Sequence, residues 1–201
     1  MCTIPKLEYF GDTYRPSDDT WLLLGVFENS SASGDLCMDL GCGSGVLGIY
    51  SLLNKKCKRV IFVDVQEDAV KTTSFNIVLN GVEVFSIILQ SDACYVSPFR
   101  ERSVDIVLAN PPYLPLQEDN SRDITIEGGI EGYEKILCFI NMAASVLKPN
   151  GLFYLVYSSL SKPEIIQLYL EKLGFKIISS RSRNFFFESL TAIEGVLNRE
   201  N

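Results

Sequence analysis

The chain has 201 residues, of which 47% are hydrophobic, with a net charge of -7 and a pI of about 4.7. This length fits one globular domain, and the acidic balance disfavours a protein that grips nucleic acid through its phosphates. The sequence lacks an apolar run of the ~18 residues that a membrane span needs, and its first residues lack the apolar core of a secretory signal.

The six cysteines fall at irregular spacings, without a C-x-x-C pair. This arrangement disfavours both a zinc site and a disulfide framework, and it indicates a reducing compartment. We therefore expect a single cytoplasmic domain over residues 1–201, with a nuclear pool also allowed. We expect no metal, no membrane and no direct nucleic-acid partner.

Strand-like and helix-like segments alternate along the chain. Apolar runs predict strands at 36–40, 60–65, 84–90, 104–109, 152–157, 175–180 and near 189–196. Helical periodicity predicts helices at 18–28, 44–54, 67–80, 133–147 and 163–173. The alternation predicts an α/β fold with a seven-stranded, mostly parallel sheet and helices on both of its faces. The last two strands lack a helix between them and should pair antiparallel.

The first 33 residues precede the first strand and form the amino-terminal segment of this single domain, and residues 34–201 form its catalytic core. Residues 15–20 predict a turn that caps a helix, with Ser17 or Asp18 as the N-cap. Capping alone would explain these polar residues. The functional alternative is that the segment 1–33 closes over a ligand.

A glycine-rich turn follows the first strand, with the sequence Asp39-Leu40-Gly41-Cys42-Gly43-Ser44-Gly45. Glycines permit a tight turn and a close approach of the backbone to a ligand, and the start of the next helix favours a carboxylate or a phosphate. Asp39 could then pair with a ligand ammonium. Asp64 ends the second strand, where an acid can bind the two hydroxyls of a ribose or cap the next helix.

The third strand is followed by Ser91-Asp92-Ala93. Asp92 could accept from an adenine amino group, although an aspartate in such a loop often only caps a helix. The glycine turn also matches the dinucleotide pattern G-x-G-x-x-G, with Asp64 16 residues after Gly48, so NAD is an alternative. Asp39, Asp92 and the motif described next together favour S-adenosylmethionine.

Asn110-Pro111-Pro112-Tyr113 follows the apolar run 104–109. The asparagine side chain supplies a carbonyl acceptor, and the Pro111 peptide carbonyl supplies a second one in a direction set by two fixed φ angles. Tyr113 adds an aromatic face. Such a set can hold a planar nitrogen with its lone pair toward an electrophilic carbon. This chemistry does not require a general base, and the chain contains no histidine.

In this order, the motifs resemble those of class I methyltransferases that act on an exocyclic or amide nitrogen, which have a Rossmann-like fold. DNA and RNA adenine methyltransferases share the Asn-Pro-Pro-Tyr motif with the HemK-type glutamine methyltransferases of peptide-chain release factors. Three further stretches resemble the eukaryotic and archaeal branch of the HemK-type group: Tyr14 to Leu24, Gly128-Gly129, and Gly151 to Arg181. The resemblance covers nearly the whole chain, without the separate helical amino-terminal domain of the bacterial enzymes.

The resemblance implies N5-methylation of the glutamine in the Gly-Gly-Gln motif of a class I release factor. A methyltransferase for adenine or lysine, or a non-catalytic scaffold that binds S-adenosylmethionine, are the alternatives. The matching cofactor positions are Tyr14, Thr20, Asp39, Gly41, Gly43, Asp64, Val65, Asp92, Ala93 and Asn110. The matching substrate and catalytic positions are Asn110, Pro111, Pro112 and Tyr113. Relatives often carry a basic residue after the double glycine, where this chain has Ile130-Glu131.

The resemblance also implies a small zinc-binding activator subunit and hence a heterodimer. The sequence offers an independent reason to expect a partner. The run from Val84 to Leu89 is apolar on both faces and is expected at an edge of the sheet. An exposed apolar edge is an aggregation hazard unless it is covered, and a partner can cover it by adding a strand. A covering helix or a shorter strand is the alternative.

Overall fold

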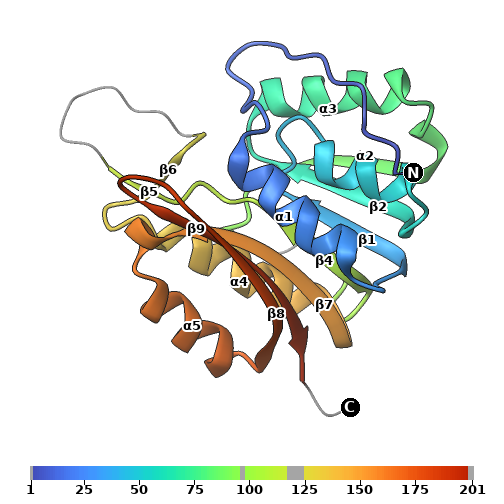
Figure 1. Ribbon diagram of the computed structural model, residues 1–201. Coiled ribbons are helices and arrows are strands. Elements are labelled where there is room, and N and C mark those ends of the chain that lie inside the picture. Colours follow the sequence, from blue (N-terminus) through green and yellow to red (C-terminus); the bar gives the residue numbers. More distant parts are fainter. Residues whose placement is uncertain (1, 96–97, 117–124, 199–201) are drawn as a thin grey trace.

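A seven-stranded sheet with helices on both faces forms the fold in the computed structural model, which describes residues 2–95, 98–116 and 125–198 (Figure 1). The sheet strands are β1 (Gly34–Leu40), β2 (Cys57–Asp64), β3 (Ser86–Gln90), β4 (Val104–Ala109), β7 (Leu147–Ser158), β8 (Phe175–Asn184) and β9 (Ser189–Leu197). The helices are α1 (Asp18–Asn29), α2 (Val46–Leu53), α3 (Glu67–Leu79), α4 (Glu134–Val146) and α5 (Pro163–Lys172). All of these elements were predicted from the sequence, but β7 begins at Leu147, five residues before the predicted start at 152, and β8 ends at Asn184, four residues after the predicted end at 180.

The strand order is β3-β2-β1-β4-β7-β9-β8, with parallel pairs from β3 to β7. β9 alone among these strands runs antiparallel, to both β7 and β8. The predicted mostly parallel sheet with an antiparallel last strand is therefore confirmed. The order reverses between β1 and β4, and in such sheets ligands bind at the carboxyl ends of the strands near that reversal.

The register of the parallel strands sets the height of the site. Leu40 of β1 pairs with Val63 of β2 and with Ala109 of β4. The residues that follow these three, among them Asp64 and Asn110, therefore lie at one level above the sheet. Residues distant in sequence meet there because parallel neighbours all end at the same edge.

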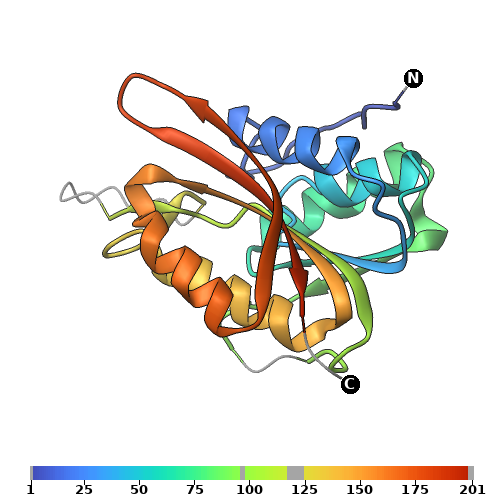
Figure 2. The ribbon, with the colours of Figure 1, turned by 60° about the horizontal axis from the view of Figure 1, so that its bottom comes forward.

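Two apolar layers hold the sheet between its helices. On one face α1, α2 and α3 pack on the strands, with Phe27 and Ile49 fully buried among residues of β1, β2 and β4. On the other face α4 and α5 pack around Phe139, Ile140 and Ile166. In Figure 2 the turn that joins β8 to β9 projects beyond the rest of the sheet. None of the helices in the described part of the chain is long and apolar enough to cross a membrane.

Two short features differ from the predicted elements. The strand expected from Val84 begins at Ser86, because Glu83–Phe85 form a 3-10 turn that leads into β3. A second, two-stranded sheet of β5 (Leu114–Pro115) and β6 (Glu127–Gly129) was not predicted. Its strands have two and three residues, too few for a periodic pattern to show in the sequence.

The cysteines also differ from the prediction. Disulfides join Cys37 to Cys57 and Cys94 to Cys138, so the expectation that the chain has no disulfides is wrong. Cys37 lies on β1 and Cys57 begins β2, and their Cα atoms are 6.0 Å apart because the two strands are neighbours. Sequence spacing alone does not reveal such a pair, since the sheet creates the proximity.

Residues 3–8 form a strap along the helical layer, held by three asparagine side chains. Asn54, Asn76 and Asn80 each accept a hydrogen bond from the amide of one strap residue and donate one to the carbonyl of the same residue. The amide contacts are 2.8 Å for Thr3 with Asn54, 2.9 Å for Lys6 with Asn80 and 2.8 Å for Glu8 with Asn76. This part of the amino-terminal segment therefore lies on the α2 and α3 side of the sheet.

Gly48 of α2 marks the closest approach of a helix to the sheet. A Cβ atom there would lie 2.3 Å from the ring of Phe62 and 2.9 Å from Val60, and both side chains are fully buried. We expect Gly48→Ala to lower the free energy of unfolding by about 1–3 kcal/mol in urea denaturation, because the core has no room for it. Gly25→Ala in α1 is the matched control, because its Cβ would meet only the end of Arg181, 3.3 Å away. Equal destabilisation by the two substitutions would contradict the packing argument.

Candidate active site

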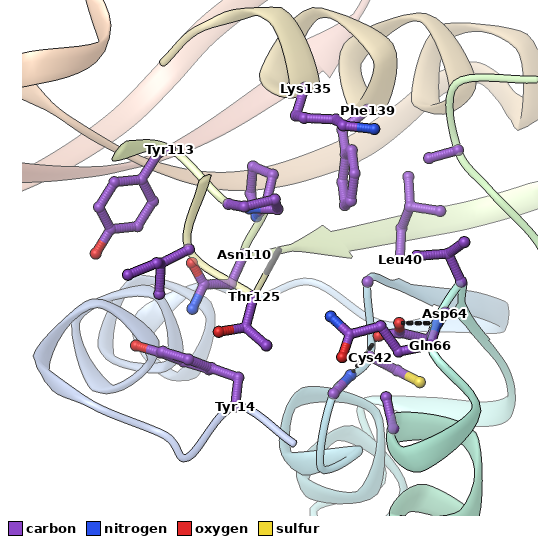
Figure 3. Close-up of a pocket in the computed structure, with 18 of the residues that line it drawn as sticks. Tyr14, Leu40, Cys42, Asp64, Gln66, Asn110, Tyr113, Thr125, Lys135 and Phe139 are labelled. Carbon is purple, nitrogen blue, oxygen red and sulfur yellow. Dashed lines mark hydrogen bonds between the residues drawn. The ribbon is translucent and has the colours of Figure 1, made fainter. Parts of the chain in front are cut away.

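A cavity of about 430 Å³ opens at the carboxyl ends of β1, β2, β3 and β4. Figure 3 shows Asn110 near its centre, between Tyr14 and Tyr113 on one side and Asp64 and Gln66 on the other. Twelve of the thirteen residues predicted for the site line this cavity: Tyr14, Thr20, Gly41, Gly43, Asp64, Val65, Asp92, Ala93, Asn110, Pro111, Pro112 and Tyr113. Asp39 is not among the lining residues.

The glycine turn is built around the end of β2. Gly41, Gly43 and Gly45 have φ angles of 70°, 52° and 78°, a left-handed conformation that favours glycine. The Gly43 amide donates to Asp64 Oδ2 at 2.9 Å, and the Gln66 amide donates to Oδ1 at 3.0 Å. Two backbone amides therefore fix the Asp64 carboxylate at the cavity wall. Its remaining lone pairs suit the hydroxyls of a ribose.

Asp39 lies behind the glycine turn and is fully buried. Its Oδ2 accepts from the Gly48 amide at 2.8 Å, whereas its Oδ1 has no hydrogen-bond partner among the described residues. Burial raises the pKa of Asp39 to about 8, against the effect of the Gly48 amide, and Asp64 raises it further. A half-satisfied buried carboxylate gains from a nearby cation, so it fits the ammonium end of an amino-acid ligand. Direct contact with that ammonium stays a prediction.

Cys42 is the cysteine nearest the expected chemistry, and it lines the cavity. Burial raises the pKa of its thiol well above the usual range, and Asp39 and Asp64 raise it further. The thiol therefore stays protonated at neutral pH and is a poor nucleophile. Since the chain also lacks histidine, the geometry favours chemistry that proceeds by placement of a substrate atom.

Asp19 joins the amino-terminal segment to the Asn-Pro-Pro-Tyr motif. Tyr14 Oη donates to both of its oxygens at 2.9 and 2.8 Å, and Tyr113 Oη donates to Oδ2 at 3.0 Å. Asn110 Nδ2 donates to Thr20 Oγ1 at 3.1 Å. Burial, and then the charge of Asp19, raise the pKa of both tyrosines above the usual range. Both hydroxyls therefore remain hydrogen-bond donors at neutral pH.

Sequence reasoning missed Asp19 as a site residue, because its position in the first turn of α1 is already explained by helix capping. It also missed Gln66, Lys135 and Phe139, which line the cavity. A possible signal for Asp19 was its place next to Thr20 in the stretch that carries the resemblance. Lys135 and Phe139 had no such signal, since α4 presents them to the cavity only in the folded chain.

Gly129 of the double glycine lines the cavity, and Gly128 packs closely against the backbone of Gly132. A Cβ on Gly128 would lie 2.2 Å from the Gly132 carbonyl, so only glycine allows this approach. Of the two residues that follow the double glycine, where the resemblance implies a basic residue, Ile130 is exposed and Glu131 forms an ion pair with Lys162. Lys162, from a different part of the chain, thus pairs with the acidic residue that follows Ile130.

Parallel strands, a glycine turn at the first strand end and acids at the next two strand ends define a class I methyltransferase fold. The chain belongs to the methyltransferase small domain family, whose model matches residues 15–178. It is 31% identical to Methyltransferase HEMK2 of Mus musculus, over 92% of this chain and 89% of that protein. It is 26% identical to a release factor glutamine methyltransferase of Streptomyces coelicolor, over 69% of this chain and 51% of that protein.

A solved structure of high similarity is that of the Mtq2-Trm112 complex of E. cuniculi, which is described as responsible for methylation of the eRF1 translation termination factor. The TM-score is 0.70 at 25% sequence identity, and the match covers 92% of this chain and 99% of that one.

The raised pKa of Asp39 predicts a pH dependence of stability. Between its ordinary pKa of 3.8 and about 8, the unfolded chain loses the Asp39 proton while the native state keeps it. The contribution of Asp39 to the free energy of unfolding is therefore favourable at low pH and is lost as the pH rises, with a slope of up to about 1.4 kcal/mol per pH unit. We expect the free energy of unfolding, measured by urea denaturation at pH 5, 6, 7 and 8, to fall less steeply with pH for Asp39→Asn than for the wild type. Parallel pH profiles of the two proteins would contradict this.

Proposed function

We propose that this protein transfers the methyl group of S-adenosylmethionine to the side-chain nitrogen of a glutamine, in the Gly-Gly-Gln motif of a class I release factor. The observation that carries the proposal is the position of Asn110, which directly follows β4 and lines the cavity together with Pro111. The names of the relatives support the glutamine and the release factor. Because such a factor works at the ribosome, we also propose a cytoplasmic location.

The family to which the chain belongs supports S-adenosylmethionine as the cofactor. When bound, it supplies an electrophilic methyl group on a positively charged sulfur. Asp64 would bind the ribose hydroxyls, and the half-buried Asp92 with Ala93 would contact the adenine at the end of β3. The glycine turn would hold the amino-acid end, and Asp39 behind it, whose Oδ1 has no partner among the described residues, would favour a cation there.

Catalysis by this protein would consist mainly of positioning a poor nucleophile, the glutamine amide nitrogen. An amide nitrogen has a delocalised lone pair, so it attacks only when it is held close to the methyl group and turned toward it. Asn110 Oδ1 and the Pro111 carbonyl would accept its two N–H bonds, and the Tyr113 ring would lie against the planar amide. Such positioning supplies effective molarities of ~10⁵ M or more. The nitrogen releases its proton after it has gained the methyl group, so this step proceeds without histidine.

An adenine amino group is also planar with two N–H bonds, and the Asn-Pro-Pro-Tyr motif alone would fit it. The net charge of -7 disfavours a nucleic-acid substrate, and the names of the relatives favour glutamine. Lysine presents a tetrahedral nitrogen, which an aromatic ring suited to a planar group fits less well.

The edge strand β3 supports a small activator subunit as partner. Val84, Phe85 and Ile87 are exposed at this edge, and Phe75 and Val78 of the neighbouring α3 extend the apolar surface. The Mtq2-Trm112 structure supports a partner of the Trm112 type for this chain. We propose that this zinc-binding partner pairs with β3 and forms a heterodimer.

The substitution Asn110→Ala tests the nucleophile site. We expect methyl transfer to fall by at least about 100-fold, because one of two positioning acceptors is lost, with the dissociation constant of S-adenosylmethionine changed less than about threefold. The measurement is peptide mass spectrometry after incubation of the co-expressed heterodimer with S-adenosylmethionine and a class I release factor. Asn141→Ala, on the exposed side of α4, is the control. Near-normal methylation by Asn110→Ala would exclude the mechanism, and an unmodified glutamine with the wild type would exclude the substrate.

The β3 interface is tested by two isoleucines of equal exposure on opposite edges of the sheet. Ile87 of β3 and Ile178 of β8 are each 52% exposed. We expect Ile87→Arg to weaken the complex with a Trm112-type subunit by at least about tenfold in isothermal titration calorimetry, because a charge would be buried at the interface. Ile178→Arg should retain the wild-type affinity. Equal affinities for the two variants would place the partner elsewhere.

A further inference from the structure

Asp19 is a buried carboxylate that the proposed chemistry does not use. It is 2% exposed, and hydrogen bonds from four groups satisfy it. The Thr20 amide donates to its Oδ1 at 2.5 Å, and the Thr20 hydroxyl donates to the same oxygen at 3.1 Å. The hydroxyls of Tyr14 and Tyr113 supply the others. A carboxylate only accepts hydrogen bonds, so all four groups must point their hydrogens at Asp19.

This requirement sets the polarity of the next hydrogen bond. A threonine hydroxyl has one hydrogen, and Thr20 donates this hydrogen to Asp19. Thr20 Oγ1 can then only accept from Asn110. The group that Asn110 turns toward Thr20 must be its NH₂, as the 3.1 Å contact from Nδ2 shows. The carbonyl oxygen of Asn110 is therefore the atom left for the cavity.

The orientation of this amide decides what the site can bind. With its oxygen toward the cavity, Asn110 accepts from an N–H group. With the amide reversed, two NH₂ groups would face each other and the acceptor would be lost. We propose that Asp19 is a positioning residue that acts through the Thr20 hydroxyl to hold the Asn110 oxygen toward the methyl acceptor. The kinetic part of this inference rests on the proposed function, whereas the orientation of the amide does not.

The same carboxylate positions the aromatic wall of the site. Its Oδ2 accepts from Tyr113, whose ring would lie against the substrate amide, and Tyr113 is held from the other side by Ser161 Oγ, which donates to its carbonyl at 2.6 Å. Asp19 thus fixes both the acceptor atom and the ring beside it.

The test uses Thr20→Val, which keeps the shape of the side chain without its hydroxyl, and Thr20→Ser, which keeps the hydroxyl. Asp19→Ala is the second variant, and thermal unfolding checks that each variant folds. The first readout is the NMR signal of the Asn110 side-chain amide, assigned by its loss in Asn110→Ala. We expect Thr20→Val and Asp19→Ala each to shift the hydrogen-bonded proton upfield and to speed its exchange with water, and Thr20→Ser to restore the wild-type signal.

The second readout is methyl transfer at saturating S-adenosylmethionine. Loss of this hydrogen-bonded chain should lower kcat by about 10-fold or more in Thr20→Val and Asp19→Ala, and Thr20→Ser should rescue it. An unchanged amide signal in both folded variants would overturn the inference. A loss confined to cofactor affinity, with kcat retained, would also overturn it, because Thr20 would then act as a cofactor contact. A wild type inactive on the release factor would refute the proposed function alone, since the NMR readout needs no substrate.

Discussion

The parallel register of three strands is the constraint on which the site depends. β1 pairs with β2 on one side and with β4 on the other, and Leu40, Val63 and Ala109 share one level. The glycine turn, Asp64 and Asn110 directly follow these three residues in the sequence. A shift of one residue in either pairing would turn one of these groups into the sheet or move it by about 3.3 Å. The close packing of Gly48 on Phe62 keeps α2, and with it the turn, at a fixed height.

Around this level, three buried aspartates are stabilised in three different ways. Asp64 is held by backbone amides, Asp19 mainly by hydroxyls, and Asp39 by one amide, with its second oxygen unpartnered among the described residues. The satisfied pair forms fixed walls of the cavity. The half-satisfied one keeps its proton in the free protein at neutral pH, and a bound cation would favour its ionised form. The cavity therefore combines rigid walls with one group whose charge responds to the ligand.

The sequence predicted the main sheet, its helices and the lining residues that belong to strand-end motifs, because apolar periodicity and such motifs are local signals. What it did not predict depends on folded proximity. Asp19 belongs to a helix start, where an acid is expected for other reasons. Cys37 and Cys57 become neighbours only through the pairing of β1 with β2. Asp39 fits the motif of a ligand contact, yet the turn of Gly41 and Gly43 places it behind the cavity wall.

The asparagines that hold the amino-terminal strap use both polar atoms of their side chains on backbone atoms alone. Each side-chain amide takes the place of a neighbouring peptide group, as in a β-ladder, although Asn76 lies inside α3 and Asn54 and Asn80 are the C-caps of α2 and α3. The attachment does not depend on the side chains at positions 3, 6 and 8. The outward surface of the strap can therefore change freely in sequence, whereas one substitution at Asn76 would remove both of its contacts to Glu8 at once.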